Sequence, residues 1–304
     1  WRERVRARVH DLLGEPPARV PPDTEVTHTV EADDHVRHRI VFDVDPTMSV
    51  PAYLLVPTGR VAGPPGTAVL AVHGHGPGKE MICGLTGPTH EHYALQLVRA
   101  GHVVLAPDLR CFGERQDPQW DPAQHKYDCD WNLVAATMAG LVPLAQNLWD
   151  LHRSIDVLVG HPLVDPGRIA VAGFSYGATM SLFCAATDTR VRAAVVSGYL
   201  SSWRVAHTVP WNMCGSQVLP GLLGRLEHLD VAALVAPRPL LVESGTDDVL
   251  FPVTAARETV ARLREVYEAL GADPDLVLHD VFEGDHRWHG RLVEPFLTTS
   301  LSPN

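Results

Sequence analysis

Residues 168–182 read RIAVAGFSYGATMSL, and this run dictates the class of fold. It opens with a short apolar run typical of a strand buried on both faces, and it ends with residues that favour a helix. Between them stands the GxSxG motif Gly173-Phe174-Ser175-Tyr176-Gly177, in which glycine on either side lets strand and helix approach without Cβ clashes. So tight a turn strains the backbone of Ser175 and pushes its hydroxyl out of the sheet. The pattern predicts that Ser175 is a catalytic nucleophile.

A serine nucleophile needs a base, and the base needs a third group that fixes its tautomer. Asp247 and Asp248 follow a predicted strand at 239–243, and we expect Asp248 to be the orienting acid. His286 and His289 follow the last predicted strand, and we expect His286 to be the general base. Asp247 and His289 stay open as competitors. The chain order Ser, Asp, His and the position of each residue at a strand end agree with this assignment.

Backbone N–H groups should stabilise the oxyanion that such a serine generates. The helix after Ser175 directs free N–H groups and a partial positive charge at the reaction centre, so Tyr176 is the first expected donor. The second is expected on the glycine-rich loop His73-Gly74-His75-Gly76, from the N–H of His75 or, alternatively, of Gly74. A zinc site of His73 and His75 with Asp108 or His286 is the less favoured alternative. We therefore expect no metal and no cofactor.

The remaining chain alternates predicted strands and helices. Continuous apolar runs predict buried parallel strands at 68–72, 103–106, 169–172, 193–196 and 240–242, with a last strand at 276–282. Helical stretches lie at 90–100, 148–159, 178–186 and 253–270, with a last helix near 290–299. Residues 37–44 and 50–56 flank a turn at 45–47 and predict an antiparallel hairpin at one edge of the sheet. This rhythm predicts an α/β-hydrolase fold, with a mostly parallel central sheet flanked by helices.

Two segments interrupt the rhythm, 111–146 and 199–236, and both are rich in Trp, Pro, Gly and His. We interpret them as insertions that form a modest cap over the site. Within them, four side chains either line an acyl or alcohol pocket or fill the cap's own small core: Trp131, Trp203, Trp211 and Cys214. Residues 1–34 read as an N-terminal helix and lead-in, because Trp1, Val5, Val9 and Leu12 recur at helical spacing. We expect one domain spanning 1–304.

Composition restricts the partners. The formal charge of −11 at pH 7 argues against general affinity for nucleic acid or an anionic membrane, so the expected partner is a small-molecule substrate, with a homo-oligomer left open. No stretch approaches the roughly 20 apolar residues of a membrane span, which favours a cytoplasmic protein, although a start at Trp1 leaves a removed signal segment open. The five scattered cysteines are expected to be reduced and mostly buried.

Three stretches carry a family resemblance: Gly173 to Gly177, the HGHG loop at 73–76, and Pro237-Arg238-Pro239-Leu240-Leu241 leading to Asp248. From about residue 35 onward the chain resembles the dienelactone-hydrolase and acetyl-xylan-esterase branch of the α/β-hydrolases. The resemblance implies an esterase or lactonase that uses Ser, His and Asp without a cofactor. Dienelactone hydrolases typically carry GxCxG, so Ser175 favours a general carboxylester over dienelactone. The run 108–113 departs at Cys111 and Phe112 from the Asp-x-Arg-Gly-x-Gly turn of many small esterases, which leaves the pocket shape open.

The sequence thus predicts a serine hydrolase that cleaves a short-acyl ester or lactone through an acyl-enzyme. The same triad would serve a biosynthetic acyltransferase or cyclase, a thioesterase or a peptidase, and these alternatives stay open. A non-catalytic binding protein on a hydrolase fold is a remote alternative, because such proteins usually lack one of the three triad residues, and all three are present here.

Overall fold

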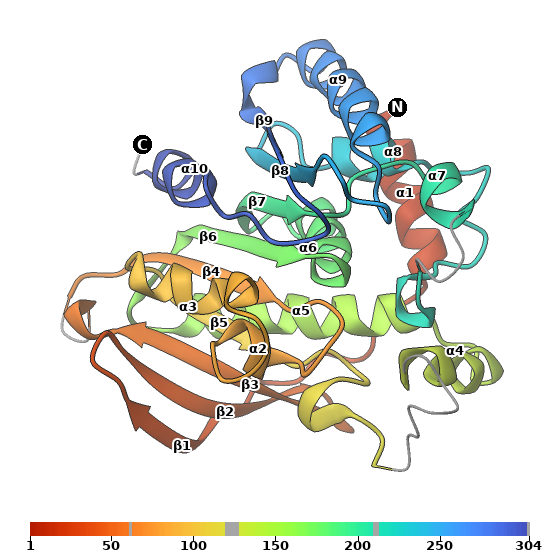
Figure 1. Ribbon diagram of the computed structural model, residues 1–304. Helices are drawn as coiled ribbons and strands as arrows, with labels where there is room; N and C mark the ends of the chain where they lie inside the picture. Colours follow the sequence, from red (N-terminus) through yellow and green to blue (C-terminus); the bar gives the residue numbers. More distant parts are fainter. Residues whose placement is uncertain (61–62, 119–127, 209–212, 303–304) are drawn as a thin grey trace.

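The molecule is built on one nine-stranded sheet, seen in a computed structural model that describes residues 1–60, 63–118, 128–208 and 213–302 (Figure 1). In spatial order the strands are β1 (Glu25–Glu31), β2 (His35–Asp45), β3 (Met48–Pro57), β5 (Val103–Pro107), β4 (Gly66–Val72), β6 (Val164–Phe174), β7 (Val191–Ser197), β8 (Leu240–Gly245) and β9 (Val277–Phe282). The pairs from β5 to β9 are parallel, and the pairs from β1 to β5 are antiparallel. This confirms the predicted fold class.

The edge of the sheet differs from the prediction. β2 and β3 form the expected hairpin, but β1 pairs antiparallel with the outer side of β2, so the hairpin is not the edge. Apart from Val30, every residue of β1 is exposed. A strand with no buried face has no burial pattern to leave in the sequence, and its backbone ladder and the bonds of Thr27 and Thr29 to β2 hold it in place.

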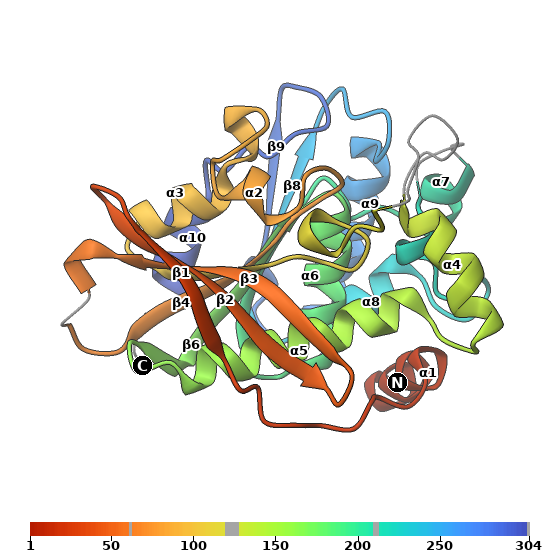
Figure 2. The same ribbon diagram turned by 90° about the horizontal axis from the view of Figure 1, so that it is seen from below.

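Helices cover both faces of the sheet, which divides the hydrophobic core into two clusters (Figures 1 and 2). One cluster includes side chains of α5 (Pro143–Gly160), α6 (Tyr176–Thr187) and α9 (Val253–Ala269). The other includes side chains of α2 (Lys79–Ile82), α3 (Tyr93–Arg99) and α10 (Val293–Ser300). Successive residues of β4 alternate between the clusters, with Leu70 in the first and Val69 in the second, as the two-residue period of a strand requires.

The N-terminal helix α1 (Arg2–Leu13) packs beside α8 (His228–Ala233), a contact that joins the start of the chain to its second half. Val5, Val9 and Leu12 are buried, as their helical spacing predicts. Trp1 is half exposed, so its predicted place on the docked face was wrong. Trp1 lies before the first helical residue, so the helical spacing that places Val5, Val9 and Leu12 on one face does not hold for its side chain.

The two segments predicted to be insertions lie side by side. Segment 111–146 contains η3 (Gly113–Arg115), α4 (Asp128–Met138) and the start of α5, which begins earlier than expected, with proline at its first position. Segment 199–236 contains α7 (Trp203–Thr208), η4 (Gly215–Gln217) and α8. The backbone N–H of Gly215 donates to Asp130 Oδ1 at 2.7 Å, which ties η4 to α4. Their role as a cap remains a prediction.

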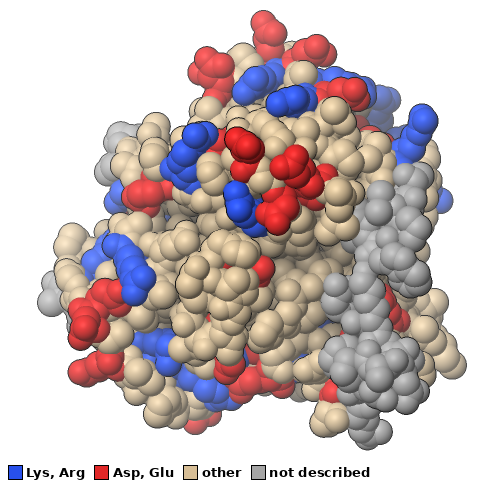
Figure 3. Space-filling view, in the orientation of Figure 1, with Lys and Arg blue, Asp and Glu red and all other residues tan. Residues whose placement is uncertain are grey.

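The surface carries charges of both signs. In Figure 3, Lys and Arg side chains are interspersed with Asp and Glu over the face that is also seen in Figure 1. Among the described residues, no helix is long and apolar enough to cross a bilayer.

Candidate active site

Ser175 stands alone in the turn between the last residue of β6, Phe174, and the first residue of α6, Tyr176. Its φ of 57° and ψ of −119° make it one of the few described residues other than glycine with positive φ. Such backbone strain persists only where the surroundings enforce it. A Cβ on Gly177 would stand 1.9 Å from the Val72 carbonyl oxygen, so only glycine allows α6 to approach β4 at this point. The turn therefore holds the serine hydroxyl at the carboxyl end of the parallel strands.

The structure brings Ser175, His286 and Asp248 together. His286 Nε2 lies 2.9 Å from Ser175 Oγ, and His286 Nδ1 lies 2.7 Å from Asp248 Oδ2. With Nδ1–H donating to the carboxylate, Nε2 is left to accept the serine proton. The Asp248 side chain is buried, and the imidazole is partly exposed to solvent. This geometry is that of a nucleophile, a base and an orienting acid.

Asp248 is held by the backbone that follows it. Its Oδ1 accepts hydrogen bonds from the N–H groups of Leu250 at 2.9 Å and Phe251 at 3.0 Å. Its Oδ2 is thereby directed at the imidazole. Asp247, the competing acid, is exposed. Of the two neighbours, the turn after β8 directs inward the carboxylate of Asp248, the residue chosen from the sequence.

His289, the competing base, takes part in a different contact. Its Nδ1 lies 2.8 Å from Asp280 Oδ2 on β9, and its ring stacks on Phe282 with centroids 4.3 Å apart. The N–H of Gly290 donates to the buried carboxylate of Glu243 at 2.8 Å. These contacts anchor the loop that carries His286 to β8 and β9.

Aromatic rings and one glycine fix the imidazole of His286 from its sides. Phe174 lies 4.6 Å from it, centroid to centroid, and Phe251 lies 5.7 Å away and nearly parallel. Gly198 has φ of 62°, and a Cβ there would come within 3.1 Å of His286 Cε1. The ring therefore has little room to rotate away from the serine.

The predicted oxyanion donors surround the same point. Tyr176 is the first residue of α6, so its N–H has no acceptor within the helix. A Cβ on Gly74 would lie 3.6 Å from the Ser175 Cβ, which brings the HGHG loop against the nucleophile turn. The ring of His75 packs against Tyr176 and Phe112, with centroids 5.2 and 5.5 Å away. The donor roles of Tyr176, His75 and Gly74 remain predictions.

His73 is a structural residue of this loop, as expected. It is fully buried, its Nδ1–H donates to the carbonyl of Gly74 at 2.7 Å, and its Nε2 accepts from the N–H of Leu109 at 2.9 Å. Burial lowers the pKa of His73, in keeping with a neutral ring. Asp108, its proposed partner in a zinc site, is bonded to Lys79 through both the backbone and the side chain. Both ring nitrogens of His73 are therefore engaged, and neither is open to zinc.

Comparison with known proteins agrees with this geometry. A family model described as an abhydrolase family matches residues 1–269, a range that includes Ser175 and Asp248. The chain belongs to the abhydrolase family. "Putative hydrolase YtaP" of Bacillus subtilis (strain 168) is 27% identical over 274 residues, 88% of this chain and 88% of that protein. The chain is a hydrolase by family and by this relative.

Solved structures share the fold of this abhydrolase. A Bacteroides fragilis NCTC 9343 protein described as a "putative acetyl xylan esterase" has a TM-score of 0.83 at 19% identity, over 98% of this chain and 87% of that chain. A glucuronoyl esterase from Solibacter usitatus has a TM-score of 0.71 at 15% identity, over 99% of this chain and 92% of that chain. These similarities show that the chain has the fold of these α/β-hydrolases.

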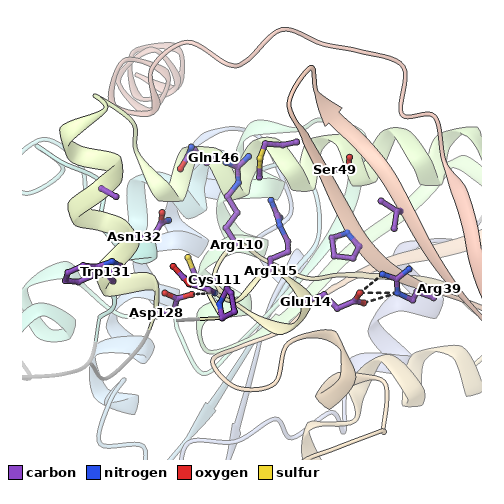
Figure 4. A pocket seen from close by; sticks show the side chains of 16 residues that line it. Arg39, Ser49, Arg110, Cys111, Glu114, Arg115, Asp128, Trp131, Asn132 and Gln146 are labelled. Carbon is purple, nitrogen blue, oxygen red and sulfur yellow. Dashed lines mark hydrogen bonds and ion pairs between the residues drawn. The ribbon is translucent and has the colours of Figure 1, made fainter. Parts of the chain in front are cut away.

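A pocket of about 860 Å³ opens between the β2–β3 hairpin and α4 (Figure 4). Charged side chains of both signs line it, and its walls include Arg39, Arg110, Cys111, Glu114, Arg115, Asp128 and Trp131. None of the three predicted triad residues, all of which the structure describes, lines it. Phe112, next to the pocket residue Cys111, contacts both His75 and Tyr176, so aromatic side chains separate the pocket from the nucleophile turn.

The four residues predicted for a substrate pocket or a cap core have different surroundings. Trp131 is largely exposed and lines the pocket of Figure 4. Trp203 is buried against His228, with ring centroids 3.8 Å apart, and Cys214 is buried beside Cys129. Trp203 and Cys214 belong to the first hydrophobic cluster, together with side chains of α5 and α6. The choice between a substrate pocket and a small core of the cap stays a prediction. Trp211 lies outside the described residues.

Sequence reasoning missed Glu91, which lies between α2 and α3. Burial raises the pKa of its carboxyl group, and the charges of His90, His286 and His92 act in the opposite direction. Its electrostatic interaction with His286 brings a further carboxyl group to the edge of the site. The residues 90–92 were assigned to the start of a helix, but α3 begins at Tyr93. No motif marks such a residue in a single sequence.

Proposed function

We propose that this abhydrolase cleaves carboxylic esters through an acyl-enzyme on Ser175. The observation that carries the proposal is the continuous hydrogen-bond path from Ser175 Oγ to His286 Nε2 and from His286 Nδ1 to Asp248, at 2.9 and 2.7 Å. Strained serine backbone at the N-terminus of a buried helix adds a second, independent argument, because the free N–H groups and the helix dipole there favour a developing oxyanion.

In the acylation step, Ser175 Oγ attacks the ester carbonyl while His286 Nε2 takes its proton. Asp248 keeps Nδ1 protonated and stabilises the imidazolium that forms. The backbone N–H of Tyr176 and that of His75 or Gly74 bind the oxyanion. Collapse of the tetrahedral intermediate releases the alcohol, which receives the proton from His286. Water then attacks the acyl-enzyme with His286 as base, and Ser175 is regenerated.

The proposed substrate is an ester with a short acyl group. His75, Phe112 and Tyr176 pack edge to face or tilted, with centroids 5.2 to 5.6 Å apart, and Tyr176 directly follows the serine, so bulky rings lie close to the nucleophile turn. The names of similar structures, acetyl xylan esterase among them, point in the same direction. An acetyl group is small enough for a site confined in this way.

The test is hydrolysis of p-nitrophenyl esters from acetyl to decanoyl, with and without a chelator, by the wild type and by Ser175→Ala. We expect turnover that falls with chain length, survives the chelator and disappears in Ser175→Ala. Ser302→Ala, which removes the hydroxyl of an exposed serine just after α10, is the matched control and should keep wild-type turnover. Turnover that persists in Ser175→Ala would refute the assignment of the nucleophile.

A further inference from the structure

A second group of reactive side chains lies next to the HGHG loop: His75, Cys129 and Cys214. One ligand atom from each, the two Sγ atoms and a ring nitrogen, lies within 4.8 Å of the others. The three residues come from separate parts of the chain, the loop after β4, the first turn of α4 and the residue before η4. Their convergence is therefore a product of the tertiary fold, and the scattered spacing of the cysteines gave no sign of it.

We propose that Cys129, Cys214 and His75 bind a Zn²⁺ ion that ties the two insertion segments to the HGHG loop. Two thiolates and an imidazole are ligands that zinc prefers, and the fourth tetrahedral position is left for water. This site differs from the sequence-based alternative, which used His73. It uses the imidazole of His75, whereas the oxyanion donor proposed above is the backbone N–H of His75 or of Gly74.

Charge balance favours a divalent ion at this place. Cys129 and Cys214 are both buried. Zn²⁺ displaces one proton from each thiol, and the two thiolates then neutralise its charge. The ion and its two thiolates together carry no net charge, whereas the ion with a single thiolate would carry one positive charge.

The surroundings already hold the ligands in place. The Cys214 sulfur accepts the backbone N–H at Gln217, and Gln217 Oε1 accepts the N–H of Cys214 at 3.2 Å. An N–H group directed at a sulfur stabilises its thiolate form. The bond from Gly215 N–H to Asp130 Oδ1 fixes the two cysteine-bearing segments against each other. Little reorganisation is therefore needed for binding.

A second group of metal-type ligands among the described residues, Glu243, Asp280 and His289, does not share these properties. His289 Nδ1 already contacts Asp280 Oδ2 at 2.8 Å, and the other oxygen of Asp280 is bonded to Arg291. Glu243 accepts from the N–H of Gly290. The bonds of His289 and Asp280 to each other and of Asp280 to Arg291 already engage two of the three residues, so this group carries no metal proposal.

The experiment is titration of the reduced, metal-free full chain with Co²⁺, a spectroscopic substitute for Zn²⁺. We expect one equivalent to produce the near-ultraviolet absorption of thiolate-to-cobalt charge transfer, and one equivalent of Zn²⁺ to abolish it. Cys129→Ser and Cys214→Ser should each lose this absorption. Cys184→Ser, which removes a buried thiol on α6, is the matched control and should keep it.

Thermal unfolding gives an independent measurement, because an ion that binds only the folded chain raises Tm. Zn²⁺ should raise Tm of the wild type and of Cys184→Ser, and have no such effect on Cys129→Ser. Absence of charge-transfer absorption in the folded wild type would overturn the proposal. So would a Cys129–Cys214 disulfide that forms in air while the reduced chain binds no metal. Neither readout involves ester hydrolysis, so failure of this proposal leaves the proposed function untouched.

Discussion

Replacing Asp248 by Asn tests how the acid sets the tautomer of His286. In the wild type, Asp248 Oδ1 accepts from two backbone N–H groups, those of Leu250 and Phe251, and Oδ2 accepts from His286 Nδ1–H. An asparagine has one oxygen and one NH₂ group for these two roles. We expect the oxygen to stay with the two backbone donors, which leaves the NH₂ group facing Nδ1. The proton of the imidazole then moves to Nε2, and the base can no longer accept from Ser175.

The expected rate loss follows from the free energy needed to turn the asparagine amide so that its oxygen again faces His286 Nδ1. Turning the amide around would set NH₂ against two backbone N–H groups and lose two buried hydrogen bonds, at roughly 1–3 kcal/mol each. A total of about 2 to 6 kcal/mol corresponds to a rate loss of about 30-fold to 3 × 10⁴-fold. The same substitution in a serine protease triad has an effect of about 10⁴-fold, which supports the upper value.

The assay is kcat/KM for p-nitrophenyl acetate, together with the rate at which a fluorophosphonate labels the enzyme. Asp247→Asn is the matched control, since it removes the same charge from the exposed neighbouring side chain and should keep near wild-type rates. Urea unfolding verifies that both variants fold. Asp248→Asn with more than about one tenth of wild-type activity, or an equal loss in Asp247→Asn, would contradict this role of the acid.

Three further predictions concern stability. Gly177→Ala should cost about 3 kcal/mol or more in urea unfolding, because the added Cβ meets a backbone carbonyl oxygen at 1.9 Å, whereas Gly160→Ala has nothing within 4 Å and should cost little. A hydrogen bond from Arg39, among other contacts, lowers the pKa of Glu114 to about 2, so stability present above pH 4.5 is lost as pH falls toward 2. After allowance for solvent screening, Glu114→Gln should reduce this acid-dependent loss by about 1 kcal/mol, and an unchanged slope would contradict it. Burial lowers the pKa of His152 to about 4, so the unfolded chain binds its proton first as pH falls below 6.5. His152→Gln should flatten the fall in unfolding free energy between pH 6.5 and 4 by about 2 kcal/mol, as measured by urea unfolding at each pH.

The parallel strands could be predicted because they are buried on both faces and leave continuous apolar runs. β6 and the turn at Ser175 are the best example. Glycine is required at this turn because a Cβ there would clash with the neighbouring backbone, in any chain that makes the same turn. β1 could not be predicted, because its side chains are exposed and its pairing with β2 rests on backbone bonds and a few polar side-chain contacts, such as those of Thr27 and Thr29. The spacing of apolar residues reveals which side chains are buried. It does not reveal a strand that pairs with its neighbour without burying a face.

The predicted site depended on where strands end, and the three triad positions follow those ends. The sequence favoured Asp248 over Asp247, and the turn after β8 supplies a physical reason, since it buries only the carboxylate of Asp248. The surroundings of Trp203 and of Cys214 could not be predicted from the sequence, because their contacts with His228 and Cys129 join segments that are distant along the chain. Such contacts depend on how the insertions fold, and a single sequence carries no periodic signal for them.

Fluorophosphonate labelling followed by peptide mass analysis tests the nucleophile itself, without any assumption about the substrate. We predict one label per chain, located on Ser175, absent in Ser175→Ala and strongly slowed in His286→Ala. A label on another residue, or an unlabelled wild-type chain that is folded, would contradict the proposal that Ser175 is an activated nucleophile.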